Sequence, residues 1–183
     1  RDKMGYKDFH TKEANVNLFA EYKFDFGLTA KYTYSQNYTD VMFDGFRYSY
    51  DLYTYDSNND TYNRSGGLSA PWRFQNKAKS TSHYHNFQVN YTKTLWEDHY
   101  ISAVWGYERS DWERDLTWLQ GAPDNNFIPL ITGTDKLTGY GDEWTYQARV
   151  GHIGRINYSY KDKYLLELLC RYDASHLYAP GKR

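Results

Sequence analysis

Three carboxylates that alternate along the chain are the residues best suited to acid and base chemistry. Asp111, Glu113 and Asp115 stand at every second position, so an extended strand would direct all three to one side. A pair of carboxylates flanking a sugar bond is the catalytic device of many glycosidases. Arg109 and Arg114 lie among them, however, and this charge balance favours an exposed arm. Without a nucleophile elbow or a phosphate-binding glycine loop, we expect no enzyme and no cofactor.

Two segments carry the residue types of a metal site. The run from Asp56 to Asp60 offers oxygen atoms at three positions of a calcium-binding loop. Thr61 replaces the glycine that such a loop needs, and Gly67 replaces its bidentate glutamate. His83 and His85 share one side of an extended strand, yet no cysteine or carboxylate lies close in sequence to complete the site. The sequence therefore predicts no metal ion.

Aromatic residues are the third candidate, and they point to binding rather than catalysis. The chain has 21 Tyr, 9 Phe and 6 Trp among 183 residues. Flat amphipathic rings offer large contact areas with few rotamers to freeze, so exposed ones can stack on sugars or peptides. The alternative is that these rings pack loops against one another. The candidates, in stretches that we expect to be loops, are Tyr48, Tyr50, Tyr53, Tyr55, Trp72, Trp112 and Trp118.

A hairpin near the end of the chain shows which elements position these residues. On both sides of a turn at Lys161 and Asp162, the even-numbered positions are mostly apolar or aromatic, and the odd-numbered positions carry most of the polar and charged residues. Successive side chains of a strand point to opposite faces, so this pattern is that of an outer-membrane barrel wall. The even face carries Val150, His152, Gly154, Ile156, Tyr158, Tyr160, Tyr164, Leu166, Leu168, Cys170 and Tyr172. The odd face carries Arg149, Arg155, Asn157, Glu167, Arg171 and Asp173, which we expect to pair across strands or to meet a plug.

Two earlier hairpins have the same layout, and long connections, roughly 35–82 and 110–142, separate the three. Short turns at the periplasmic rim and long loops at the outer rim are typical of outer-membrane barrels. Six strands do not close such a barrel, which has at least about eight, so we expect part of a larger one. The two hairpins join 15–22 to 27–34 through 23–26, and 87–92 to 101–108 through 94–98. Aromatic girdles are expected from Tyr22 and Trp96 at one rim, and from Tyr34, Trp105, Tyr107 and Trp144 toward the other.

Composition argues against other classes. The 22 basic and 23 acidic residues give a net charge of -1, so no basic field favours nucleic acid. The sequence has no apolar run of roughly 18 residues, as a membrane helix would require. Cys170, the single cysteine, cannot form a disulfide within the chain and is expected to be a small apolar side chain of the wall. The N-terminus lacks the pattern of a signal peptide, so we expect a chain that begins inside a longer protein or has lost that peptide.

The last hairpin also carries a resemblance. Residues Gly154 to Leu166, followed by Arg171 to Ser175 and by Ala179-Pro180-Gly181, closely resemble a hairpin of the SusC/RagA-like TonB-dependent outer-membrane transporters. The family usually has glycine where Ala174 stands. Residues 90–109 resemble the hairpin that precedes it in that family. The resemblance is in register over about residues 87 to 183, whereas the first hairpin agrees only in pattern.

This resemblance implies a barrel of about 22 strands in the Gram-negative outer membrane, in contact with outer-membrane lipid. Such a transporter imports oligosaccharides or peptides with a SusD-like surface lipoprotein, and the TonB complex energises it through a plug domain. Residues 1–183 would then be a partial barrel domain, with the plug outside this chain.

A soluble, secreted, carbohydrate-binding β-sandwich is the alternative, because it also has many strands, abundant tyrosine and long loops. Strand length distinguishes the two classes. The alternating segments 144–160 and 163–175 exceed the usual length of about 5 to 6 residues for globular strands. They suit a tilted membrane crossing of about 9 to 11 residues with an extension. The sequence therefore favours an all-β, antiparallel, transmembrane barrel wall with long extracellular loops.

Overall fold

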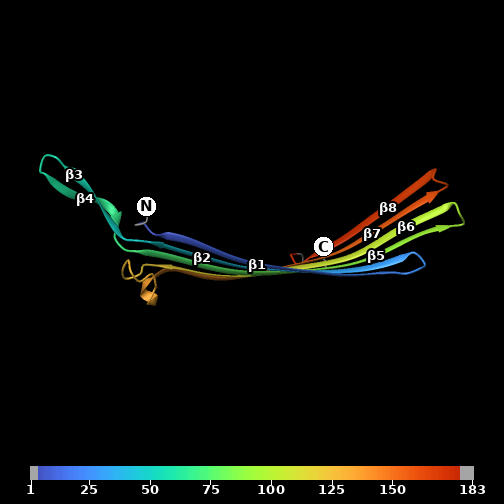
Figure 1. Ribbon diagram of the computed structural model, residues 1–183, viewed down its shortest axis with the longest axis horizontal. Helices are drawn as coiled ribbons and strands as arrows, with labels where there is room; N and C mark the ends of the chain where they lie inside the picture. Colours follow the sequence, from blue (N-terminus) through green and yellow to red (C-terminus); the bar gives the residue numbers. More distant parts are fainter. Residues whose placement is uncertain (1–3, 178–183) are drawn as a thin grey trace. The chain divides into compact units, whose positions relative to one another are not determined.

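The computed structural model describes residues 4–177, so the Ala179-Pro180-Gly181 motif lies outside the described residues. Strands dominate this part of the chain, and a 3-10 turn, η1 (Thr134–Lys136), precedes β7. None of the described helical segments is long and apolar enough to cross a membrane. The strands are β1 (Tyr6–Lys23), β2 (Leu28–Arg47), β3 (Tyr50–Asp56), β4 (Thr61–Leu68), β5 (Trp72–Leu95), β6 (His99–Gly121), β7 (Leu137–Tyr160) and β8 (Tyr164–Ser175) (Figure 1).

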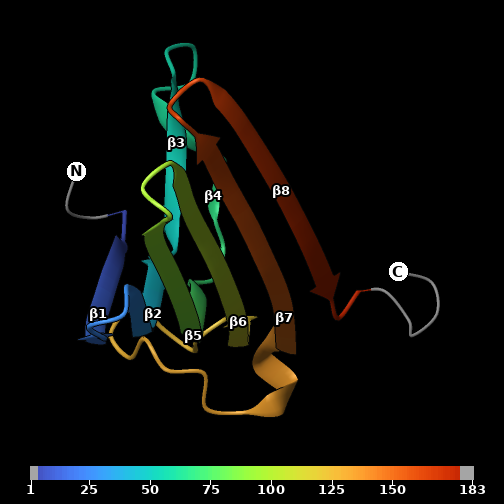
Figure 2. The ribbon, with the colours of Figure 1, turned by 90° about the vertical axis from the view of Figure 1, so that its right-hand side faces the viewer.

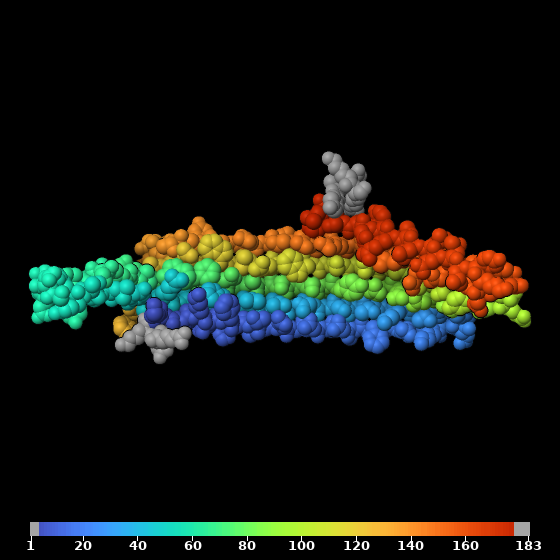
Figure 3. Space-filling model, turned by 90° about the horizontal axis from the view of Figure 1, so that it is seen from above, coloured from blue at the N-terminus to red at the C-terminus, as the bar shows by residue number. Residues whose placement is uncertain are grey.

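Six of the described strands form one antiparallel sheet in the order β1-β2-β5-β6-β7-β8, and β3 pairs with β4 in a separate hairpin. Figure 2 shows β5 to β8 side by side, and Figure 3 shows the strands as adjacent bands that follow the sequence. Within the described residues the sheet is open, with β1 and β8 at its edges. The predicted all-β class and the three predicted hairpins are confirmed.

The strands are much longer than the sequence pattern indicated. β5 and β7 have 24 residues each and β6 has 23, more than twice the roughly 9 to 11 residues of a membrane crossing. The expectation that 35–82 and 110–142 are long loops is therefore wrong for most of both stretches. Tyrosine, threonine and other residues that favour strands continue the pairing there. The sequence pattern missed it because regular apolar alternation, the signal of a half-buried strand, is weak in these stretches.

Contacts divide the chain into two units, which we describe separately. The turn unit comprises Glu13–Tyr38, Ser80–Glu113 and Thr145–Arg183, and it holds the three short turns. The loop unit comprises Arg1–Lys12, Thr39–Lys79 and Arg114–Trp144, and it holds the β3–β4 hairpin and the connection between β6 and β7.

In the turn unit, the register of β7 and β8 confirms the predicted apolar face. Gly154 lies opposite Cys170, and Ile156 lies opposite Leu168. These positions remain open to the surroundings, and Leu168 has 57% of its surface exposed. A soluble sandwich would bury this face against a second sheet, whereas Ile156 and Leu168 on this face are exposed.

The opposite face of the same hairpin is less uniform than the sequence pattern indicated. Leu165 and Leu169 are exposed there, at 79% and 68%, and pair with Ser159 and Arg155. The odd positions thus mix leucine with charge. Such a mixture is compatible with a lumen that holds both water and protein.

Aromatic and histidine rings gather in several clusters of the turn unit, two of which centre on His99 and His152. Near the turns, Nδ1 of His99 lies 2.7 Å from the Tyr158 hydroxyl. The ring of Trp96 packs edge-on against the same histidine ring, with the ring centres 5.7 Å apart. Farther along the strands, His152 lies 6.0 Å from Trp105. The second cluster also includes Tyr107 and Tyr172. Of the rings expected at the girdles, Tyr34 bonds His83 and Tyr22 contacts Phe24, whereas Trp144 belongs to the loop unit. The histidines were not predicted, since sequence alone does not mark them as girdle residues.

The short turns hold the strand ends together. In the first turn Gly27 has a φ of 94°, and its carbonyl accepts a hydrogen bond of 2.9 Å from the amide of Thr92. A Cβ at Gly27 would collide with the Thr92 carbonyl oxygen. The third turn, predicted at Lys161 and Asp162, donates the Lys161 amide to the carbonyl of Asp98 at 2.9 Å. Neighbouring elements are therefore tied directly at this rim.

The loop unit contains a small core and an anchored connection. Phe46 is the one large hydrophobic side chain that is fully buried in residues 4–177, at 2% exposure. Nearby, the Arg73 guanidinium bonds Asp44 at 3.0 Å and the carbonyl of Pro129. The side chains of Arg73 and Asp44 are only 10% and 16% exposed. One buried arginine thus fixes the connection 122–133 to β2 and β5.

Two further contacts hold this connection. Asn126 accepts a hydrogen bond from the Ser49 amide at 2.7 Å and donates one to its carbonyl at 3.1 Å. Lys136 donates to Asp124, and this bond holds the pKa of that carboxyl below its usual value. The tip between these anchors leaves Phe127, Ile128 and Leu130 exposed, Phe127 at 91%.

We expect Gly27→Ala to lower the free energy of unfolding by more than about 1 kcal/mol, because alanine is strained at positive φ and its Cβ has no room. Urea titration of the full-length protein in detergent would measure this. Gly154→Ala is the matched control, since a Cβ there meets nothing within 4 Å and strand alanine is no worse than glycine. Equal losses for both variants would contradict this account of the turn.

We expect Arg73→Leu to loosen the connection 122–133 at a cost of about 3 to 5 kcal/mol, because it leaves Asp44 buried without its partner. Hydrogen exchange of the connection would measure the loss of protection. The double variant Arg73→Leu with Asp44→Leu should recover much of the stability, since no buried charge remains. A single variant with unchanged exchange would show that the ion pair does not anchor the connection.

Candidate ligand-binding site

The seven aromatic residues predicted to bind ligand do not form one site. Six belong to the loop unit and Trp112 belongs to the turn unit. Most of them lie on strands rather than in irregular loops. Tyr48 lies between β2 and β3, and the others are Tyr50, Tyr53 and Tyr55 on β3, Trp72 at the start of β5, and Trp112 and Trp118 on β6.

Three of these rings pack inside the loop unit. Tyr48 meets the buried Phe46 edge-on, with ring centres 5.2 Å apart. Trp72 and Trp118 stack near Phe74, at 6.0 and 6.2 Å. These contacts agree with the packing interpretation. A role in ligand binding for the three rings stays a prediction.

A group of exposed tyrosines lies on the β3–β4 hairpin, and we call it the tyrosine platform. Tyr53 and Tyr55 are two positions apart on β3, and the register places Tyr62 of β4 opposite Tyr55. Their exposed fractions are 57%, 50% and 71%. Tyr50 lies farther along β3 and is 38% exposed. The sequence analysis missed Tyr62, which the alternation of the second hairpin arm could have revealed.

The hairpin turn uses the oxygen atoms that suggested a calcium loop. Asp56 accepts hydrogen bonds from the backbone amide of Asn58 at 3.0 Å and from the side chain of Asn59 at 2.7 Å. These bonds, that from Asn58 first, lower the pKa of Asp56. Asp60 accepts a bond of 2.7 Å from the Tyr55 hydroxyl. Residues 4–177 contain no group of three His, Cys, Asp or Glu side chains that could hold a metal ion.

Three of the other chemical candidates, His83, His85 and Asp111, also have structural partners. The rings of His85 and His83 lie 2.8 and 2.9 Å from the hydroxyls of Tyr32 and Tyr34. Asp111 pairs with Arg109 at 3.6 Å, as a charge-balanced arm would.

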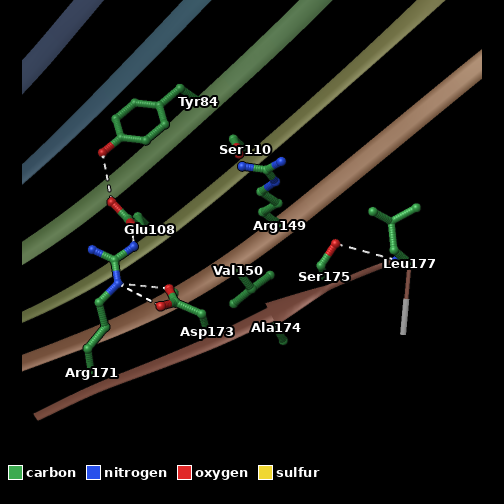
Figure 4. A pocket seen from close by; sticks show the side chains of 11 residues that line it. Tyr84, Glu108, Ser110, Arg149, Val150, Arg171, Asp173, Ala174, Ser175 and Leu177 are labelled. Carbon is green, nitrogen blue, oxygen red and sulfur yellow. Dashed lines mark hydrogen bonds and ion pairs between the residues drawn. The ribbon is translucent and has the colours of Figure 1, made fainter. Parts of the chain in front are cut away.

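A cavity of about 710 Å³ is hollowed into the polar face of the turn unit, and we call it the polar cavity (Figure 4). Arg171 of β8 bonds Glu108 of β6 at 2.7 Å and Asp173 at 2.7 Å. Tyr84 of β5 donates its hydroxyl to Glu108 at 3.3 Å. The predicted pairing of inward charges across strands is therefore confirmed for Arg171, whose partner Glu108 the sequence analysis did not name. Asp173 instead pairs with Arg171 within β8.

Arg149 of β7 lies at the same cavity but differs from the other charges. In Figure 4 no dashed line joins its guanidinium to another of the residues drawn. Tyr84, Ser110 and Arg149 also line an adjoining hollow of about 340 Å³, which Trp112 helps to enclose. Trp112 is thus the predicted aromatic residue that the structure places beside charged groups at a cavity.

The arrangement can hold a ligand. Of the carboxylates at the polar cavity, Glu108 and Asp173 both bond Arg171, which leaves neither placed as a free acid or base. Two paired acids, a guanidinium, hydroxyls and an indole ring instead resemble the few polar groups that orient a ligand in a pocket of this size.

Comparisons with known proteins agree with this fold. No protein-family model and no curated protein matches the chain. It is similar to solved chains of the RagAB peptide transporter (20% identity, 97% of this chain covered, TM-score 0.80) and of the RagAB peptide importer in its open-open (20%, 94%, 0.76) and closed-closed (21%, 94%, 0.75) states. This chain spans 18 to 19% of the length of those chains. At this identity the likeness establishes the fold alone, and the predicted barrel-wall fold is confirmed.

Proposed function

We propose that this chain is part of the barrel wall of a SusC/RagA-like, TonB-dependent transporter in a Gram-negative outer membrane, and that the transporter imports peptides. The observation that carries the proposal is the fold likeness to a peptide transporter over 97% of the chain. The residues 154–175, which resemble the hairpin of that family, support it. The transporter needs no chemistry of its own, so the chain has no catalytic role.

The exposed apolar face of the turn unit supports the membrane placement. In this proposal Leu166, Leu168 and Ile156 face lipid, and the aromatic clusters around His99 and His152 mark the interfaces. The short turns then face the periplasm, and the β3–β4 hairpin and the connection 122–133 face the exterior. The plug domain that would contact the TonB complex lies outside this chain.

The polar cavity supports peptide as the cargo. Glu108, Arg171, Asp173 and Arg149 bring both signs of charge to one surface. Peptides carry charged termini and amide groups, whereas oligosaccharides are mostly neutral. An oligosaccharide could still stack on the tyrosine platform, so both cargo classes belong in the test.

The exposed tip of the connection 122–133 supports a partner at the outer surface. Phe127, Ile128 and Leu130 are apolar and exposed, and anchors at Arg73 and Asn126 hold the tip in place. An aromatic side chain on an anchored loop loses little entropy when it enters a partner pocket. We assign this tip to the contact with a SusD-like surface lipoprotein.

Cells that lack the parent gene should lose uptake of fluorescent oligopeptides, and the full-length gene should restore it. Uptake of labelled oligosaccharides, measured in parallel, should not change. The protein should fractionate with the outer membrane and shift on heating in a semi-native gel, as closed barrels do. Unchanged peptide uptake, or a soluble protein without a heat shift, would contradict the proposal.

Phe127→Ser should weaken co-purification with the surface lipoprotein by about tenfold or more, because a central aromatic anchor is lost. The matched control is Phe26→Ser, which changes an exposed phenylalanine at a short turn. If both variants retain the lipoprotein equally, the tip is not the contact.

A further inference from the structure

Arg149 is the charged side chain of the polar cavity that lacks a partner. Within residues 4–177, Arg171 is bonded to both Glu108 and Asp173, whereas the side chain of Arg149, whose backbone pairs with Ser175, makes no hydrogen bond or ion pair. The two acids share one guanidinium, so that cluster of three carries a net charge of about -1. Arg149 is left as a separate positive charge on the neighbouring strand.

The surroundings of Arg149 favour a ligand with hydroxyl and carboxylate chemistry. Ser110 lines both the polar cavity and the adjoining hollow together with Arg149, while the Glu108 carboxylate bonds Tyr84 and Arg171 (Figure 4). A guanidinium offers a planar fork of donors that matches a carboxylate with two parallel bonds. Ser110 can add a hydroxyl donor. The recognition groups for one carboxylate are therefore present.

The charges and the volume of the polar cavity restrict which ligands it can bind. The nearby acids Glu108 and Asp173 disfavour a doubly charged phosphate, whereas a carboxylate brings a single charge. The volume of about 710 Å³ falls within the range of roughly 300 to 1,000 Å³ that is usual for ligand pockets. Trp112 in the adjoining hollow offers an apolar surface for a side chain next to that carboxylate.

We propose that Arg149, assisted by Ser110, binds a carboxylate of the transported peptide in the polar cavity. The inference rests on the proposed peptide import and names the group that the cavity recognises. The carboxylate belongs either to the peptide C-terminus or to an acidic side chain. Both sources present the same chemistry to the guanidinium.

The test measures binding of fluorescent pentapeptides to the full-length protein with its lipoprotein in detergent. The peptides are a free acid, its C-terminal amide, and an amide that carries one glutamate. The free acid should bind about 10- to 100-fold more tightly than the plain amide. Arg149→Ala should abolish that difference. Arg149→Lys should retain part of it, because the charge stays but the fork is lost.

Arg155→Ala is the matched control, because Arg155 is an exposed arginine on the same face of β7 and lies outside the polar cavity. It should bind both peptides as the unchanged protein does. A heat shift like that of the unchanged protein would verify that each variant is folded.

The outcomes separate the two proposals. If the amide with glutamate binds as tightly as the free acid, the carboxylate site stands and accepts side chains. If free acid and plain amide bind equally, or if Arg155→Ala acts like Arg149→Ala, the Arg149 site is wrong although peptide binding stands. If no peptide binds, peptide import fails as well.

Discussion

Backbone pairing between neighbouring strands is the interaction on which the rest of this chain depends. A single sheet layer has almost no core of its own, and in residues 4–177 only Phe46 is a fully buried large hydrophobic side chain. Strands of up to 24 residues therefore rely on continuous ladders of hydrogen bonds. In hydrocarbon such ladders must be complete, because an unpaired backbone group costs several kcal/mol, on the order of a lost hydrogen bond or more.

Pairing in register also assigns each residue to one of two environments. A shift by one position would move every side chain to the opposite face. The observed register keeps Ile156 with Leu168 on one face and sets Arg155 and Arg171 on the other. The apolar face and the polar cavity are thus two consequences of the same ladder, and the tight turns at Gly27 and Lys161 maintain it.

The alternation of apolar and polar residues along the chain was enough to predict much of the fold. Alternation around residues 150–172 predicted both faces of the last hairpin, and turn positions followed from where that alternation stops. Alternation did not predict the strands in residues 35–82 and 110–142. There β2, β5, β6 and β7 continue through residues that were expected to be loops. Strand pairing there needs no apolar period, so regular apolar alternation was too weak to reveal it.

For the candidate site too, part could be predicted from the sequence and part depended on the tertiary structure. By itself the sequence determined the all-β class, the two-faced wall and a set of aromatic candidates that includes Trp112. Only the tertiary structure decided that Tyr62 faces Tyr55, that Trp72 and Trp118 are packed, and that Glu108 and Asp173 share Arg171. It also decided that Arg149 is left without a partner among the described residues. The physical reason is that alternation along one strand is a local property, whereas partners across strands depend on register between segments far apart in the sequence, such as Glu108 and Arg171, which are 63 residues apart.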